Sequence, residues 1–194
     1  MFGCETDEKR DIVAMGAKDV GKTTLLTNIA YGQPLPLGPT MSAHYSIKMR
    51  KDGGTPFQVF LHDAPGYRSG TTLQRMYYPT HHDGYLMMFD INNKESFQIV
   101  QEIGNAKRAE ERDADVKKKM YLLGTKKANY EEKDRAVTGD DVNGLVTEWG
   151  CNFQEVDVFQ RGDCMQVIKA LLIDILEGAQ EDSSSLIQEA IGLM

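Results

Sequence analysis

The stretch that most constrains this chain is residues 16–24, which read GAKDVGKTT. A short apolar run at 12–15 precedes it, and apolar residues at helical spacing follow it. This is the strand-loop-helix setting in which G-x-x-x-x-G-K-[ST] forms a phosphate-binding loop. The glycines let the backbone turn its N–H groups toward phosphate oxygens, and the helix N-terminus adds the positive end of its dipole. The motif therefore predicts a P-loop nucleotide-binding protein.

The side chains of the loop predict how a nucleotide would be held. Lys22 is expected to reach the β- and γ-phosphates, and the Thr23 hydroxyl is expected to be a ligand of Mg²⁺. The remaining loop residues offer backbone N–H groups to the phosphates. The predicted nucleotide-binding residues of the loop are Gly16, Lys18, Asp19, Val20, Gly21, Lys22, Thr23 and Thr24.

Length, charge and cysteine content exclude several other classes of protein. The chain has 194 residues, about one domain, and its net charge of −7 disfavours nucleic acid as a partner. Its three cysteines lack metal-ligand spacing, and reduced thiols suit the cytoplasm. No apolar run approaches the length of a membrane span, and neither a myristoylation nor a prenylation pattern is present. We expect a cytoplasmic protein without a direct membrane anchor.

Apolar strand-like runs alternate with helical patterns along the chain, which predicts a doubly wound α/β sheet. Residues 43–50 and 57–62 alternate in polarity around the turn sequence KDGGTP, which predicts an antiparallel hairpin at one sheet edge. In all, the pattern predicts six strands and about five helices, one of them short and near 71–78.

These elements fall within residues 11–178, which we expect to form the domain, after an N-terminal extension at 1–10. The tail at 179–194 begins polar and ends with apolar residues at near-helical spacing. This spacing predicts a short amphipathic helix folded back on the domain, with a partner-docking segment or disorder as alternatives.

Together the motifs resemble those of the Ras superfamily of small GTP-binding proteins, and most closely its Rab-like members. Beyond the phosphate loop the resemblance rests on LGPT ending at Thr40, DAPG at 63–66, the segment 76–97, LGTK at 123–126 and EWGCNFQEV at 148–156. The resemblance implies the fold of that family, a six-stranded, mostly parallel sheet with one antiparallel edge hairpin and about five helices. It also implies GTP or GDP as the bound nucleotide, with Mg²⁺.

The resemblance assigns roles outside the loop. Thr40 would engage Mg²⁺ and the γ-phosphate, Asp63 would hold a Mg²⁺-bound water, and the Gly66 N–H would contact the γ-phosphate. Thr125 and Lys126 would belong to the base-recognition motif. The implied metal set is thus Thr23, Thr40 and Asp63, and an effector or scaffold protein would dock on switch regions at about 35–45 and 64–78.

The hydrolysis residues depart from the family pattern. Members that hydrolyse GTP usually carry a glutamine after D-x-x-G, whose amide orients the attacking water, whereas this chain has Tyr67. Lys18 replaces a small residue of the loop and should crowd the space an activating arginine would enter, or itself supply charge to the γ-phosphate. Pro65 stiffens the second switch. We therefore assign no catalytic residue and expect slow hydrolysis.

The base-recognition residues depart as well. The family pattern [NT]-K-x-D ends in an aspartate that pairs with guanine, and this chain has Ala128 there. Guanine preference should fall unless another carboxylate or carbonyl takes its place, for which Asn129, Glu131 and Glu132 are candidates. The segment that supports the base from the other side corresponds to residues 158–160, where Phe159 either stacks on the base or fills the emptied pocket.

Two interpretations follow. In the first, the chain is a nucleotide-binding switch with slow or partner-dependent hydrolysis. In the second, it is a pseudo-GTPase, an interaction module that binds nucleotide weakly, without selectivity or not at all. The four histidines show no metal-ligand spacing, and His81 and His82 are expected on a loop surface.

Overall fold

The computed structural model describes residues 8–35, 43–51, 54–68, 82–113, 118–126, 131–177 and 186–188. In chain order its elements are β1 (Lys9–Gly16), α1 (Lys22–Tyr31), β2 (Ala43–Lys51), β3 (Pro56–Asp63), β4 (Gly84–Asp90), α2 (Lys94–Asp113), β5 (Lys119–Lys126), the 3₁₀ helix η2 (Glu132–Asp134), α3 (Gly139–Trp149), β6 (Asn152–Asp157), α4 (Arg161–Glu177) and β7 (Leu186–Gln188). No helix in these ranges is both long and apolar enough to cross a bilayer.

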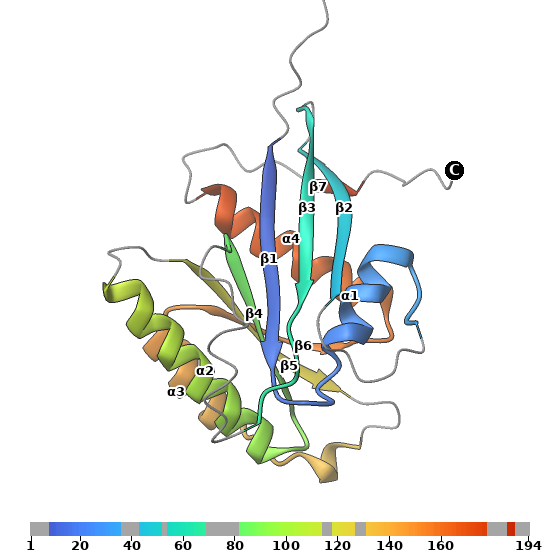
Figure 1. Ribbon diagram of the computed structural model, residues 1–194. Helices are drawn as coiled ribbons and strands as arrows, with labels where there is room; N and C mark the ends of the chain where they lie inside the picture. The colour runs from blue at the N-terminus through green and yellow to red at the C-terminus, as the bar shows by residue number, and fades with distance from the viewer. Residues whose placement is uncertain are drawn as a thin grey trace, which may run out of the picture.

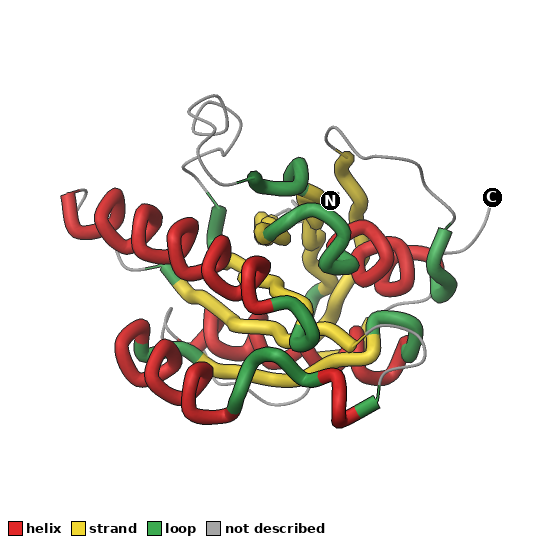
Figure 2. Tube along the Cα trace, turned by 90° about the horizontal axis from the view of Figure 1, so that it is seen from below, coloured by secondary structure: helices red, strands yellow, loops and turns green. Residues whose placement is uncertain are grey.

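The strands form one sheet in the order β6-β5-β4-β1-β3-β2-β7. Strands β1, β3, β4, β5 and β6 run parallel to their neighbours within that set, and β2 pairs with β3 in the antiparallel sense. Figure 1 shows α4 passing behind β1 and β3, and Figure 2 shows the strands as a layer with helices on both sides. The predicted α/β domain, with a mostly parallel sheet and an antiparallel edge hairpin, is confirmed.

The central strands are buried because helices cover both faces of the sheet. All seven residues of β4 are buried, and so are the last five of β1. Parallel strands in this position appear in the sequence as continuous apolar runs rather than alternating ones. The hairpin strand β3 instead alternates between buried and partly exposed residues, because one of its faces is only partly covered.

Trp149, the last residue of α3, joins α3 to α2. Its indole N–H donates to Asn105 Oδ1 at 2.9 Å, and its ring lies where a Cβ on Gly104 would come within 2.1 Å. The missing side chain of Gly104 therefore lets the two helices pack closely on the same side of the sheet.

The tail differs from its sequence prediction. Leu186–Gln188 form strand β7, which pairs antiparallel with residues 49–51 of β2, so the prediction of a helix is wrong at these residues. An edge strand offers unpaired N–H and C=O groups to any extended segment that reaches it, and a short apolar run does not by itself distinguish helix from strand. The rest of the tail and the helix predicted near 71–78 lie outside the described residues, which hold four α-helices.

Candidate functional site

The phosphate loop joins the carboxyl end of β1 to the N-terminus of α1, as its motif predicts. Its backbone takes positive φ at Gly16 (150°), Asp19 (62°) and Gly21 (90°). At Gly16 a Cβ would lie 2.1 Å from the carbonyl oxygen of Met88 in β4, so only glycine fits between the two strands. The shape of the loop is therefore fixed by its backbone and its close approach to β4.

Lys22, the first residue of α1, folds back into the loop. Its side chain is 6% exposed, and Nζ donates to the carbonyl oxygens of Ala17 (2.7 Å) and Gly16 (3.3 Å). Burial lowers the pKa of Lys22 from 10.5 to about 8, against the opposing effect of the Asp63 and Asp19 charges. A buried ammonium with a depressed pKa gains stability from any anion that enters the loop.

Thr23 and Asp63 meet beside this lysine. Thr23 Oγ1 donates to Asp63 Oδ2 at 2.5 Å, and the carboxylate at the end of β3 is buried. Within the described part of the chain, Asp63 Oδ1 is buried without a hydrogen-bond partner. Burial raises the pKa of Asp63, while the Thr23 hydroxyl and the Lys22 charge act in the opposite direction. A buried carboxylate oxygen without a donor, next to a hydroxyl, fits the oxygen ligands that Mg²⁺ prefers.

The segment after β3 closes against the phosphate loop. Tyr67 N–H donates to Gly16 O at 3.0 Å, and Tyr67 forms an isolated parallel bridge with Ala17. A Cβ on Gly66 would lie 2.6 Å from Lys18 Cα, so glycine is required for this approach. The Tyr67 side chain is partly buried and packs against the hydrophobic core. The Lys18 side chain is half exposed, and its Nζ lies 3.4 Å from Asp19 Oδ2.

Thr125 ties the end of β5 to the loop. Its buried hydroxyl lies 2.9 Å from the carbonyl oxygen of Val20 and 3.0 Å from that of Phe89, and its proton can be donated to either. Thr125, predicted to belong to the base-recognition motif, therefore holds the phosphate loop against the sheet, a role that its sequence pattern does not reveal.

Two cationic side chains hold Glu155 of β6 near the carboxyl end of β5. Lys126 Nζ lies 3.0 Å from Glu155 Oε2 and Arg135 Nη1 lies 2.8 Å from Oε1. The hydrogen bond from Arg135 and the one from Lys126 lower the pKa of Glu155, and burial acts against them. Of the carboxylates predicted as substitutes, Glu131 pairs with Lys133 at 2.6 Å and Glu132 with Arg135 at 2.7 Å.

The turn after β6 lies beside the phosphate loop. The Val158 side chain is 3.4 Å from where a Cβ on Gly21 would be, and Val158 O accepts a 3.0 Å hydrogen bond from buried Asn28 Nδ2 in α1. Phe159 is 47% exposed, so its ring does not fill a closed pocket. Thr40, Ala128 and Asn129 lie outside the described residues.

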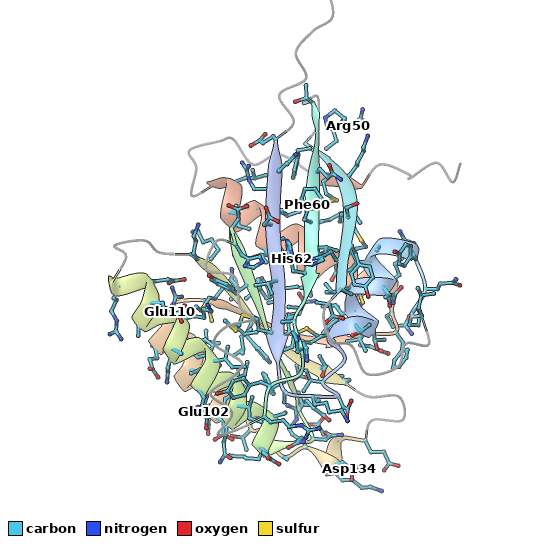
Figure 3. The ribbon with its side chains drawn as sticks, in the orientation of Figure 1. Arg50, Phe60, His62, Glu102, Glu110 and Asp134 are labelled. Carbon is cyan, nitrogen blue, oxygen red and sulfur yellow. The ribbon has the colours of Figure 1, made fainter. Side chains whose placement is uncertain are left out.

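Two histidines of neighbouring strands, β2 and β3, and one from the segment before β4 lie close together. His62, labelled in Figure 3 on β3, lies with Nδ1 2.8 Å from His44 Nδ1 and Nε2 2.6 Å from Asp11 Oδ1. The ring of His82 lies 4.6 Å from that of His62, and His82 is 2% exposed, so its predicted place on a loop surface is wrong. Burial follows from packing against His62 and Tyr85. Among the described residues, no three His, Cys, Asp or Glu side chains are arranged to hold a metal ion.

Fold and site together define a phosphate-loop α/β domain in which a buried lysine and a buried carboxylate face the same loop. A sequence model of the Ras family matches residues 11–177. The chain therefore belongs to the Ras family, as the resemblance of its motifs implied.

Relatives of several kinds agree with this assignment. The chain is 25% identical over 182 residues to Ras-related protein RABC2a of Arabidopsis thaliana, covering 93% of this chain and 85% of that protein. It is 25% identical over 171 residues to the GTP-binding protein Rheb homolog of Dictyostelium discoideum, covering 88% and 89%. It is 33% identical over 94 residues to human NF-kappa-B inhibitor-interacting Ras-like protein 1, covering 46% and 48%.

Proposed function

We propose that this protein is a Mg²⁺-dependent guanine-nucleotide-binding switch of the Ras family in which hydrolysis of GTP is slow or depends on a partner. One observation carries the proposal. Lys22 is buried with a lowered pKa beside Asp63, whose buried Oδ1 has no hydrogen-bond donor among the described residues. A nucleotide phosphate would supply an anion for Lys22, and its Mg²⁺ would supply a cation for Asp63.

The residues present fit this group. Thr23 and Asp63 would hold Mg²⁺ together with Thr40, and Lys22 would leave its two carbonyl partners to donate to the phosphates. When bound, Mg²⁺ neutralises phosphate charge. The loop N–H groups and the Gly66 N–H would complete the donor set, while Thr125 would keep the loop in place through Val20 O. The GTP-binding name of the Dictyostelium relative supports the same function.

Slow hydrolysis is proposed because the group that would orient the attacking water is absent. The Tyr67 backbone is held by Gly16 O, and its side chain packs partly against the core. A phenol has a single hydroxyl, farther from the backbone, in place of the separate NH₂ donor and carbonyl acceptor of an amide. Lys18 lies against Gly66, and its side chain would crowd the approach of an activating arginine to the γ-phosphate.

A protein partner is the second part of the proposal. An effector or scaffold would dock on the switch regions at about 35–45 and 64–78 when triphosphate is bound. The cytoplasmic location and the domain limits at 11 and 178 stay predictions from the sequence.

A pseudo-GTPase remains the second candidate, and one observation favours it. The segment through Tyr67 already closes on Gly16 and Ala17, and Lys22 already donates to both carbonyl groups of that turn. A loop whose carbonyl groups and lysine are already paired internally gains less from a ligand. In this case the closed loop itself would be the surface presented to partners.

The two candidates separate in one experiment. The nucleotide content of freshly purified, denatured protein is measured by chromatography, and the emptied protein is titrated with GTP, GDP, ATP and XTP in Mg²⁺. Stoichiometric nucleotide, lost in Lys22→Met, supports the switch, whereas an empty protein that binds none of the four overturns it. Single-turnover hydrolysis then compares the protein with Tyr67→Gln, and a wild-type rate typical of an activated GTPase contradicts slow turnover.

A further inference from the structure

The carboxyl ends of β5 and β6 lie side by side, and their register brings one more carboxylate to the place where the base is expected. Lys126, the last residue of β5 and the second of the predicted base-recognition motif, pairs in register with Asp157. Ligands of open α/β sheets bind outside the carboxyl ends of the strands. Asp157 is therefore a candidate for the acceptor that Ala128 cannot supply.

The three glutamates near this end of the sheet are occupied. Both oxygens of Glu155 face cations, and Glu131 and Glu132 each form an ion pair. Asp157 differs, because Oδ1 accepts from Phe159 N–H at 2.9 Å and, within the described residues, Oδ2 accepts no hydrogen bond. A carboxylate held by one oxygen keeps the other for a ligand.

The turn that carries Asp157 is fixed relative to the phosphate loop. Gln160 N–H donates to Asp157 O at 2.9 Å, and Asn28 Nδ2 holds Val158 O at 3.0 Å. Because Asn28 lies in α1, directly behind the phosphate loop, the position of the turn is coupled to that of the loop. Phe159 follows in the same turn with a large, partly exposed ring.

Resting on the proposed function, we propose that Asp157 selects the base of the bound nucleotide and that Phe159 covers its face. A carboxylate accepts well from two neighbouring N–H donors, and guanine presents N1–H and its 2-amino group on one edge. Adenine presents an acceptor at N1 and no 2-amino group, so the same carboxylate disfavours it. The stacking ring adds affinity without choosing among bases.

Asp157→Asn tests the assignment. The amide oxygen still accepts from Phe159 N–H, so the turn is kept, while an NH₂ donor replaces the open oxygen. Affinity for GTP should fall about 10-fold to 100-fold, the effect of losing a charge-assisted hydrogen bond. Affinity for XTP, whose 2-oxo group accepts a hydrogen bond, should rise, so that the preference inverts. Asp163→Asn, in the first turn of α4, is the matched control and should leave the GTP/XTP ratio unchanged.

The GTP and XTP affinities of Asp157→Asn and of the wild type test this inference separately from the proposed function. An unchanged GTP/XTP ratio in Asp157→Asn, with both nucleotides still bound, overturns the role of Asp157 and leaves the switch intact. A wild-type protein that binds no nucleotide overturns both. Should Asp157→Asn fail to fold, Asp157→Ser keeps a side-chain acceptor for Phe159 N–H without the charge and should lose GTP preference without gaining XTP. Equal GTP/XTP ratios in Asp157→Ser and wild type overturn the role of Asp157.

Discussion

The proposed phosphate side and the proposed base side of this site lie at the same end of the sheet but are held by different kinds of contact. On the phosphate side, backbone geometry sets the shape of the loop, through positive φ at three loop residues and the close approach of Gly16 to β4. On the base side, single side chains form the contacts, among them Thr125, Glu155 and Asp157. A site made by backbone is lost or kept as a unit, whereas a site made by side chains can be rebuilt one residue at a time.

The largest effect is expected when the backbone of the phosphate side is disrupted. In Gly16→Ala the new Cβ would meet Met88 O at 2.1 Å, so the loop or β4 must move. We expect a loss of about 3 kcal/mol or more in the free energy of unfolding, together with loss of nucleotide binding. Urea unfolding measures the first effect. Gly144→Ala in α3 is the control: a Cβ there meets nothing within 4 Å, and alanine should stabilise the helix slightly. Equal stability of the two variants would contradict the backbone argument.

The second largest effect is expected when a charge is removed from the phosphate side without moving its backbone. Lys22→Met should lower the affinity for GTP and GDP about 100-fold, because charged hydrogen bonds to the phosphates are lost. Stability of the empty protein should not fall, since a buried charge is removed with it. Isothermal titration measures the affinity, with Lys133→Met, whose side chain is 72% exposed, as the control. A loss of less than threefold would argue that Lys22 does not reach the phosphates.

Thr125→Val tests the link between the two sides. Valine keeps the shape of threonine but removes the hydroxyl that donates to Val20 O or Phe89 O. We expect the free energy of unfolding to fall by about 1–3 kcal/mol, and affinity for GTP and ATP to fall by equal factors. Selective loss of GTP would instead mean that the Thr125 hydroxyl reads the base.

A pH titration of the empty protein sharpens the description of Lys22. The pKa of Lys22 is about 8 in the folded state against 10.5, so between these values the unfolded chain binds more protons and stability rises with pH. Relative to Lys22→Met, wild-type stability should rise by about 1 kcal/mol from pH 7 to pH 9. The comparison uses unfolding of both proteins at each pH. Parallel curves would show that the lysine is not held in a buried, desolvated position.

The smallest effect concerns stacking on the base side. Phe159→Ala should weaken binding of GTP, ATP and XTP alike by about fivefold, at the low end of measured stacking effects. Competition titrations with the three nucleotides measure the ratios. Tyr31→Ala, at another exposed aromatic residue, is the control and should leave all three affinities unchanged. A change in preference rather than in common affinity would place Phe159 in base selection.

Sequence reasoning was reliable where one local rule decides the outcome. The G-x-x-x-x-G-K-T pattern located the turn between β1 and α1, because glycine and a helix N-terminus are needed there whatever surrounds them. Continuous apolar runs indicated the buried parallel strands, and alternation indicated the hairpin. These features depend on neighbours a few residues away, and so the chain by itself determined them.

Contacts between distant residues were decided only by the tertiary structure. Nothing near residue 186 reveals that β2 leaves an edge on which β7 can pair, and nothing near His82 reveals that His62 and Tyr85 bury it. The register that sets Asp157 beside Lys126 likewise joins strands separated by a helix, although the Asx turn from Asp157 to Phe159 N–H is a local signal that could have been noticed. The sequence determined the fold class and the phosphate loop, whereas the partners of the base-side residues depended on strand register, which only the folded chain sets.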